Sequence, residues 1–271
     1  MSDKIKELAE EIKKLSKTDN YSIKIIEEEP EIFDSKIGGI AYWTPDLAYP
    51  VNSEGKKLFL LAQINFEKEK TESPLPTNGL LQFFTFDDNE KGLNFANLTE
   101  QENFRVVYHQ NIDYKMTKES VKEFDISDSK NEEYFPILGE YKIALKKSVD
   151  YVNPWDIRFK KFFSIAYKEI YGKELKEDDN IYNVLNNEER TELEDEFVTD
   201  NLKHKMLGYS DFIQEDPRED EKYADYDTLL LQIDSEEDYV SWDCGIGNFF
   251  INKKALLEKD FSKVLYYWDS S

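Results

Sequence analysis

Residues 58–66 of this 271-residue chain read LFLLAQINF, and residues 228–234 read TLLLQID. Two leucines, a glutamine and an isoleucine coincide when Gln63 is aligned with Gln232, at an offset of 169 positions (232 − 63 = 169). An apolar run of this length is typical of a strand that is buried on both faces. A glutamine inside such a strand is unusual, so its recurrence indicates that the two segments are copies of one structural unit.

Three further segments recur around this strand, in the same order. They are IGGIAYW at 37–43 and MLGYSDF at 206–212, GLLQFFTF at 79–86 and GIGNFFI at 245–251, and RVVYHQ at 105–110 and KVLYYW at 263–268. Such self-similarity indicates an internal duplication, and variable spacing between the segments is typical of surface loops. We therefore predict an α+β fold in which each copy is a small, mostly antiparallel sheet, and the two sheets share one core or pack side by side.

Helical segments flank the first copy and separate it from the second. In residues 3–16, apolar side chains recur every three or four positions, which predicts an amphipathic helix. Pro154 is well placed in the first turn of a second helical region, in which two asparagines, at 186 and 187, interrupt the apolar pattern. We predict a single duplicated domain over residues 1–271, made of an N-terminal helix in 1–20, the first copy with an extension in 21–150, a helical insertion in 151–201 and the second copy in 202–271.

Composition narrows the class of protein. The chain is 39% hydrophobic and 14% aromatic, which is too apolar for a disordered protein. Its single cysteine, Cys244, cannot form an internal disulfide, and its first residues carry scattered charges that are not typical of a signal peptide. No apolar run approaches the roughly 18 residues that would cross a membrane. These features predict a cytoplasmic protein without a membrane segment.

The charge of the chain is extreme and uneven. The formal net charge is −23, and residues 173–238 hold 23 acidic and 7 basic side chains, a net of −16. Such a surface repels nucleic-acid phosphates, so we do not expect direct binding of nucleic acid. It attracts a basic protein or peptide. The alternative interpretation is that the acidity only maintains solubility.

Amide side chains are the most specific polar signal in the predicted strands. Gln82 in the first copy aligns with Asn248 in the second, next to the recurring glutamines. A buried amide needs partners for its donors and its acceptor, so these side chains either satisfy the backbone of the glycine loops or line a groove that binds an extended peptide. The second interpretation predicts a cleft between the copies, lined by Trp43, Gln63, Gln82, Gln214, Arg218, Gln232, Trp242 and Asn248.

Few residues could carry catalysis or bind a metal. His109 falls opposite Tyr267 in the repeat, which favours a packing role, and no cluster of cysteine and histidine predicts a zinc site. No nucleotide-binding motif predicts a cofactor. Cys244 lies in DCGIG without a histidine near it in the alignment, and Arg218 in DPR is expected to form an internal ion pair. An enzyme using Cys244 or the carboxylates of Asp216 and Asp243 is the alternative to a binding protein.

The motifs GGIAYWTPDLAYP, KKLFLLAQINF, LPTNGLLQFFTF, GYSDFIQEDPR, DTLLLQID, WDCGIGNFFI and DFSKVLYYWD together resemble the YwqG family of bacterial proteins over nearly the whole chain. The family pattern has a glycine and an acid after the last-but-one tryptophan, whereas Asp243 and Cys244 follow Trp242 here. The resemblance implies a cytoplasmic α+β protein with a duplicated core and no established activity.

The GG-aromatic, LLAQI and LQFF segments also resemble, more distantly, the eukaryotic programmed cell death 2 and Tsr4 proteins, which are chaperones for a ribosomal protein. The zinc-binding cysteine pairs of those proteins are absent from this sequence. The resemblance implies capture of a protein segment. We therefore predict a non-enzymatic protein- or peptide-binding module without metal or cofactor, either a chaperone or an immunity protein for a basic partner.

Overall fold

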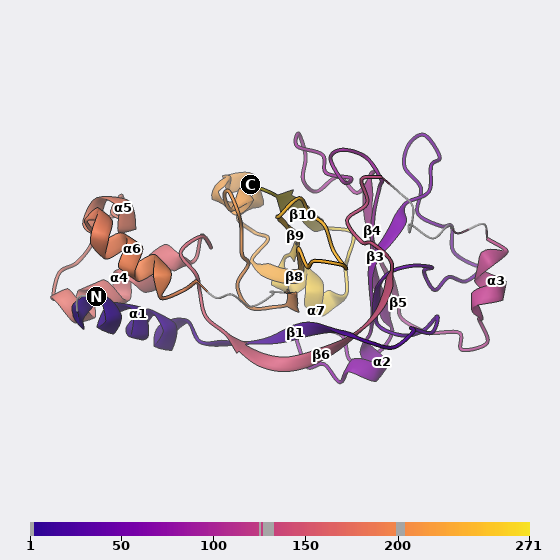
Figure 1. Ribbon diagram of the computed structural model, residues 1–271, viewed down its shortest axis with the longest axis horizontal. Coiled ribbons are helices and arrows are strands. Elements are labelled where there is room, and N and C mark those ends of the chain that lie inside the picture. The colour runs from indigo at the N-terminus through magenta and orange to yellow at the C-terminus, as the bar shows by residue number, and fades with distance from the viewer. Residues whose placement is uncertain (1–2, 125, 127–132, 199–203) are drawn as a thin grey trace.

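The computed structural model describes residues 3–124, 126, 133–198 and 204–271, and within these ranges the strands form one sheet (Figure 1). The strands are β1 (Thr18–Ile26), β2 (Lys36–Gly38), β3 (Phe59–Asn65), β4 (Leu80–Thr85), β5 (Phe104–His109), β6 (Glu140–Asp150), β7 (Lys205–Met206), β8 (Thr228–Asp234), β9 (Ile246–Ile251) and β10 (Val264–Asp269). Their order across the sheet is β10-β9-β8-β7-β1-β6-β2-β3-β4-β5, and each neighbouring pair is antiparallel. The fold is therefore a mixture of helices and strands built on a large antiparallel sheet that curls until it is nearly barrel-shaped.

The two predicted sheets are parts of one sheet, because a long two-stranded ribbon joins them. β1 and β6 pair over nine positions, from Thr18 opposite Asp150 to Ile26 opposite Lys142. β7 adds to the outer side of β1, and β2 adds to the outer side of β6. This central ribbon thus connects the four strands at one end of the sheet with the four at the other end. Figure 1 shows it as the long curved strands beneath the rest of the sheet.

The two ends of the sheet share their register. Lys36 lies opposite Gln63 and Lys205 lies opposite Gln232, and both following strands contain a bulge one or two residues before the glutamine. Gln63 then pairs with Gln82 as Gln232 pairs with Asn248. Equivalent positions at the two ends can therefore be assigned from the pairing itself.

This register corrects the alignment of the last strands. Phe83 lies opposite Val106, and its counterpart Phe249 lies opposite Tyr266. Val106 therefore corresponds to Tyr266, whereas the sequence alignment matched it with Val264, two positions earlier. The position of His109 is accordingly filled by Asp269 and not by Tyr267. The misalignment arose because Val106-Val107 within β5 resemble Val264-Leu265 at the start of β10.

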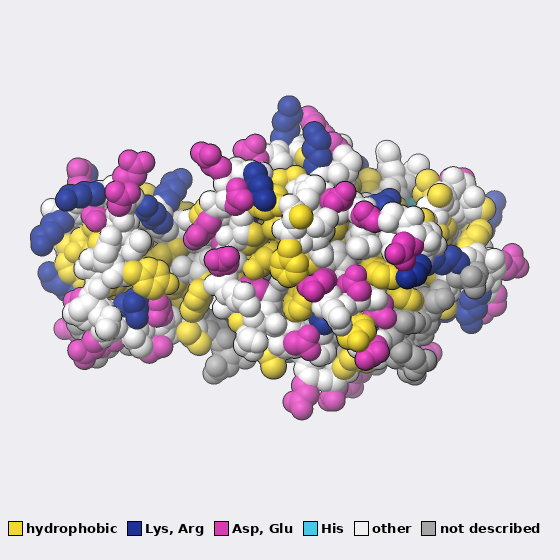
Figure 2. Space-filling model, turned by 90° about the horizontal axis from the view of Figure 1, so that it is seen from above, with side chains coloured by type: hydrophobic (Ala, Val, Ile, Leu, Met, Phe, Trp, Pro, Cys, Tyr) yellow, Lys and Arg dark blue, Asp and Glu magenta, His cyan; other side chains and the backbone are white. Residues whose placement is uncertain are grey.

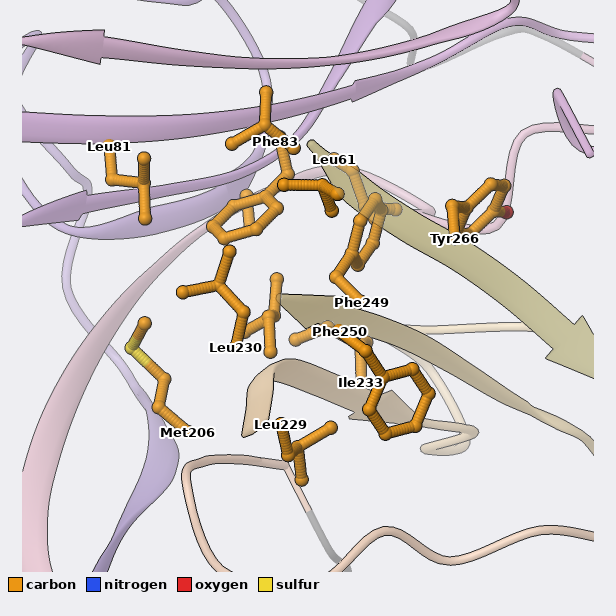
Figure 3. Packing of buried hydrophobic residues seen from close by; sticks show 14 of the residues in the cluster. Leu61, Leu81, Phe83, Met206, Leu229, Leu230, Ile233, Phe249, Phe250 and Tyr266 are labelled. Carbon is orange, nitrogen blue, oxygen red and sulfur yellow. The ribbon is translucent and has the colours of Figure 1, made fainter. Parts of the chain in front are cut away.

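The main core lies inside the curled sheet, where the two ends face each other. The rings of Phe83 and Phe249 are 5.0 Å apart between centroids, and Phe249 stacks on Tyr266 at 4.6 Å. Figure 3 shows these side chains converging from the two ends of the sheet, with Leu61 and Leu230 beside them. The gap between the outermost strands is bridged by a loop, because the N–H of Tyr266 donates to the carbonyl of Leu98 over 2.9 Å.

The described helices are α1 (Asp3–Ser16), α2 (Phe66–Glu69), α3 (Lys118–Lys122), α4 (Phe159–Tyr171), α5 (Ile181–Val184), α6 (Asn187–Asp195) and α7 (Lys253–Glu258). The predicted N-terminal helix over 3–16 is confirmed, and it packs with α4 and α6 around a second apolar cluster at one end of the molecule (Figure 1). Among the described segments, no helix is both long and apolar enough to pass through a bilayer.

The helical insertion begins and divides differently from the prediction. The side chain of Asn153 accepts a hydrogen bond from the N–H of Trp155, which folds residues 153–158 into turns, so α4 begins at Phe159 and not at Pro154. Asn186 does not merely interrupt a helix, because its side chain caps the first turn of α6. The predicted start of the second copy, at residues 202–203, lies outside the described residues.

Replacing Phe249 with alanine is expected to lower the free energy of unfolding by about 3–5 kcal/mol, because the ring is fully buried where the ends of the sheet meet. Urea denaturation followed by circular dichroism would measure the loss. Leu257→Ala on the exposed side of α7 is the control and should change stability by less than about 0.5 kcal/mol. Equal effects of the two substitutions would contradict the assignment of the core.

Candidate functional site

Two buried glutamines hold the backbone of a loop against the outer face of the sheet. The Nε2 of Gln63 donates to the carbonyls of Ile32 and Asp34, both over 2.9 Å, and its Oε1 accepts from the N–H of Tyr42 over 3.0 Å. The Nε2 of Gln82 donates to the carbonyl of Tyr42 over 2.8 Å and to the Oε1 of Gln63 over 2.9 Å. The N–H and the carbonyl of one loop residue, Tyr42, are thus both paired by side-chain amides.

The second half repeats this arrangement at Asp211. The Oε1 of Gln232 accepts from the N–H of Asp211 over 2.8 Å, and the Nδ2 of Asn248 donates to the carbonyl of the same residue over 3.0 Å. Asp211 occupies the place of Tyr42 at the same offset as the glutamines (211 − 42 = 169). The interpretation that these amides satisfy the backbone of the glycine loops is therefore confirmed.

The amides point away from the core that the two halves share. On β4, Phe83 faces the inner cluster, so the neighbouring Gln82 lies on the opposite face of the strand, and Asn248 beside Phe249 does likewise. The two amide sets therefore lie on the outer faces of opposite ends of the sheet. The predicted cleft between the copies, lined by all eight residues, is not formed by these side chains.

Buried lysines stand beside both glutamines, and the sequence analysis missed them. The Nζ of Lys36 donates to Glu140 over 2.7 Å and to the carbonyl of Ile40 over 2.6 Å. Burial lowers the pKa of Lys36. Lys205 is also buried, yet Asp211 and Asp150, each 3.0 Å from its Nζ, outweigh that burial and raise its pKa. The recurrence of KIGG as KMLG, at the same offset, was the available signal.

Arg218 forms the internal ion pair that the sequence predicted. Its guanidinium is 2.6 Å from Asp216 and 3.1 Å from Asp156, and it lies 4.3 Å from the centre of the Phe250 ring. Burial pushes the pKa of Asp156 upward, but Arg158 and Arg218 outweigh it and hold that pKa well below its usual range. The cluster is buried and its charges are mutually satisfied, which favours a structural role.

The remaining predicted site residues are dispersed. Gln214 is exposed and donates to the carbonyl of Ser270, whereas Trp43 is buried and donates from Nε1 to the carbonyl of Leu47 over 2.9 Å. Trp242 is buried beside Trp268 with a centroid separation of 6.0 Å. These three side chains and the four amides do not converge on one surface.

The groups considered for catalysis are also apart from one another. Cys244 is exposed in a left-handed turn. The second of the two histidines in the sequence, His204, has both ring nitrogens engaged, by Glu236 and by the N–H of Asp234. Asp216 is held by Arg218, and Asp243 pairs instead with Lys91 over 3.0 Å. Over the ranges that the structure describes, no three histidine, cysteine or acidic side chains are grouped so as to hold a metal ion.

His109, for which the sequence favoured a packing role, is packed against aromatic rings and also borders a surface hollow. Its ring lies 5.1 Å from both Tyr42 and Trp43, its Nε2 is 2.9 Å from the Oε1 of Gln82, and it is 4% exposed. Burial lowers the pKa of His109 to about 4, although Asp46 opposes the shift. The ring forms part of the wall of a surface hollow of about 490 Å³, here called the His109 hollow, which is lined by Tyr42, Thr44, Pro45, Asp46, Leu47, Tyr108, His109, Gln110, Asn111, Ile112 and Asp113.

Comparison with known protein families identifies the family of this chain. A family model described as a domain of unknown function (DUF1963) matches residues 35–270. The chain belongs to this family. The match runs from β2 to β10, so it includes both ends of the sheet and the helical insertion but not α1 or β1. No curated protein matches the chain. The finer resemblances to the YwqG proteins and to the programmed cell death 2 and Tsr4 chaperones stay predictions.

Gln63→Leu should lower the free energy of unfolding by about 3 kcal/mol, because it leaves the N–H of Tyr42 and two carbonyls without a partner in the protein interior. Chemical denaturation would measure the difference. Gln214→Leu is the matched control, since that amide is exposed, and should stay within about 0.5 kcal/mol of the wild type. A Gln63→Leu protein as stable as the control would contradict the bracing role.

His109 should make stability fall in mild acid. Its pKa is about 4 in the folded chain against an ordinary value of 6.5, so its contribution is complete above pH 6.5 and is lost as the pH falls toward 4. Between pH 7.0 and 4.5 the wild type should lose about 2–3 kcal/mol more than His109→Phe, which keeps a ring but cannot titrate. Urea titrations of both proteins at the two pH values would show it, and parallel losses would refute it.

Proposed function

We propose that this protein is a non-enzymatic module that binds an extended segment of another protein along the outer edge of β5. The observation that carries the proposal is that no further strand among the described residues is paired with the outer edge of β5. β5 is the last strand in the order of the sheet, and a side chain stands where the next strand would be. Addition of a strand to an exposed sheet edge is a recurring mode of peptide recognition.

The outward backbone groups of β5 are suited to accept a strand. The N–H of Val106 points away from β4 and donates over 2.9 Å to the Oε1 of Gln101. Alternate residues of an antiparallel strand direct their backbone groups to the same side, so the N–H and carbonyl of Tyr108 face outward as well. The opposite edge of the sheet is occupied differently, because the N–H of Tyr266 on β10 is bonded to the carbonyl of Leu98. β5 is therefore the better edge for a partner.

A groove runs beside this edge. A hollow of about 500 Å³ lies between β5 and the turn that precedes β10. Its wall includes Tyr108 and Phe261, whose ring centroids are 5.3 Å apart, and Lys259 lies 5.5 Å from the centre of the Tyr108 ring. Aromatic walls next to a strand edge that only a side chain covers suit the side chains of an extended segment.

The nature of the partner follows from charge. The net charge of −23 favours a basic segment and speeds its encounter with the protein. On the face shown in Figure 2, acidic and basic side chains are interspersed and hydrophobic atoms are exposed between them, so specific contacts have to add to the overall attraction. Roles as a chaperone for a basic protein or as an immunity protein for a basic toxin both meet this description.

An evolutionary duplication is part of the same proposal. The shared register of the sheet ends, the two glutamine–amide pairs and the two buried lysines support it. Under this view the first copy lies in residues 21–150 and the second in 202–271. The copies have since diverged at β5 and β10: the outward N–H of Val106 is bonded to the side chain of Gln101, whereas that of Tyr266 is bonded to a main-chain carbonyl.

Val106→Pro tests the edge. Proline removes the outward N–H without removing a bond of the β4–β5 ladder, and prolines are tolerated at edge strands. Peptides selected from a random displayed library on the wild type should bind Val106→Pro at least about tenfold more weakly, since main-chain pairing supplies the affinity. Isothermal titration calorimetry would measure both affinities.

Val106→Ile is the matched control, because it keeps the N–H and an apolar, β-branched side chain at this buried position, and it should bind within about twofold of the wild type. Circular dichroism would establish that both variants are folded. Unchanged peptide affinity in a folded Val106→Pro protein would exclude recognition at this edge.

A further inference from the structure

The geometry points to a further site: we infer that the His109 hollow binds the ammonium or guanidinium group of a lysine or arginine side chain. This inference deepens the proposed function, on which it rests for the source of that side chain, namely the segment bound at β5. Three observations carry it: a fixed acceptor at the wall of the hollow, carboxylates at its rim, and its position at the end of β5.

The acceptor is fixed by a chain of hydrogen bonds that starts at the backbone. Gln63 has no freedom of orientation, because one end of its amide meets two carbonyls and the other meets an N–H. Gln82 then has to turn its Nε2 toward the carbonyl of Tyr42 and the Oε1 of Gln63, which leaves its own Oε1 for His109. The imidazole therefore donates from Nε2 and carries a lone pair on Nδ1.

That lone pair is available to a ligand. The structure gives Nδ1 no hydrogen-bond partner among the described residues, and Nδ1 is not one of the fully enclosed side-chain atoms that lack one. It therefore opens on the hollow, although the ring as a whole is 4% exposed. A neutral, nearly buried imidazole with a free acceptor is matched by a ligand that donates a hydrogen bond.

The rim selects for positive charge among such donors. Asp46 and Asp113 line the hollow, and among the described residues that form its wall there is no lysine or arginine. The hydroxyl of Thr44 donates to Asp46 and lowers the pKa of that carboxyl, which keeps it ionised. Two carboxylates and an imidazole acceptor around one hollow favour an organic cation with several N–H donors.

The position of the hollow connects it with the strand edge. Tyr108 lines both the His109 hollow and the groove beside β5, so both depressions border the end of this strand. A segment paired with β5 would pass the hollow near the end of the strand. A basic side chain of that segment would then reach Asp46 and the Nδ1 of His109 without leaving the extended conformation.

The first test uses small probes and does not depend on any partner. Nα-acetyl-arginine amide is titrated into the protein at pH 7, with Nα-acetyl-citrulline amide as the uncharged control of the same shape, and the ring nitrogens of His109 are followed by ¹⁵N NMR. We expect Nε2 to be protonated and Nδ1 bare before addition, and the arginine probe to shift Nδ1 at concentrations about tenfold lower than the citrulline probe. Equal effects of the two probes, or a proton on Nδ1, would overturn the inference.

Asp46→Asn should weaken the arginine probe about fivefold to tenfold. Glu10→Gln removes the same charge from an exposed position of α1 and should leave the affinity unchanged. Equal weakening by both variants would mean that the probe senses only the overall charge, which would also overturn the inference.

The second test separates this inference from the proposed function. In peptides selected on the wild type, replacing one lysine or arginine by glutamine should cost about tenfold on the wild type and much less on Asp46→Asn, as a double-mutant cycle. Val106→Pro should weaken the peptides while leaving the arginine probe unaffected. If peptides bind at the edge without this coupling, the hollow is refuted and the edge stands; if the probe binds but Val106→Pro does not weaken peptides, the reverse holds.

Discussion

Each end of the sheet depends on one interaction, in which two side-chain amides pair the N–H and the carbonyl of a single loop residue. The chain leaves β2 through Gly38 and Gly39, both with left-handed backbone, and leaves β7 through Leu207 and Gly208 in the same conformation. It then crosses the outer face of apolar strands, where no neighbouring strand can pair with it. A peptide group needs one acceptor and one donor, and a primary amide offers both, whereas a carboxylate or a hydrophobic side chain does not. This requirement explains why glutamine and asparagine recur inside strands that are otherwise apolar.

The buried lysines add an electrostatic constraint on the same strands. Lys36 pairs with Glu140 and Lys205 with Asp150, and these carboxylates are the first and last residues of β6. Buried ion pairs contribute little net stability, since removing both charges from water costs about as much as their attraction returns. Their larger effect is to disfavour other strand registers. If β2 or β7 were shifted along the central ribbon, a buried ammonium group would lose its carboxylate. The two lysines therefore favour one register of the sheet over its neighbours.

The sequence predicted the elements whose burial gives a clear apolar pattern, and it did not predict the strand whose side chains are partly exposed. β3, β4, β8 and β9 were predicted because they are apolar on both faces, and α1 because its apolar residues follow a helical period. β1 was missed, since it lies in a ribbon whose side chains are partly exposed, and its pattern is correspondingly weak. Without β1 the single sheet could not be derived. The amides were singled out correctly, but whether they served a loop or a ligand depended on which face they occupied, and that was set by a bulge that the sequence does not reveal.

The two halves differ in the charged groups that they place on their outer faces. In the second half, the place of His109 is taken by Asp269, and the Oδ1 atoms of Asp269 and Asn248 find no donor among the described residues. That half also supplies its own cation to its outer face, because Arg218 lies over Phe250 between two carboxylates. The first half has an acceptor and carboxylates at its surface, and no lysine or arginine is among the described residues that line the His109 hollow. A framework with the same bracing at both ends is therefore internally neutralised at one end, and under our proposal the other end is the one that receives a basic partner.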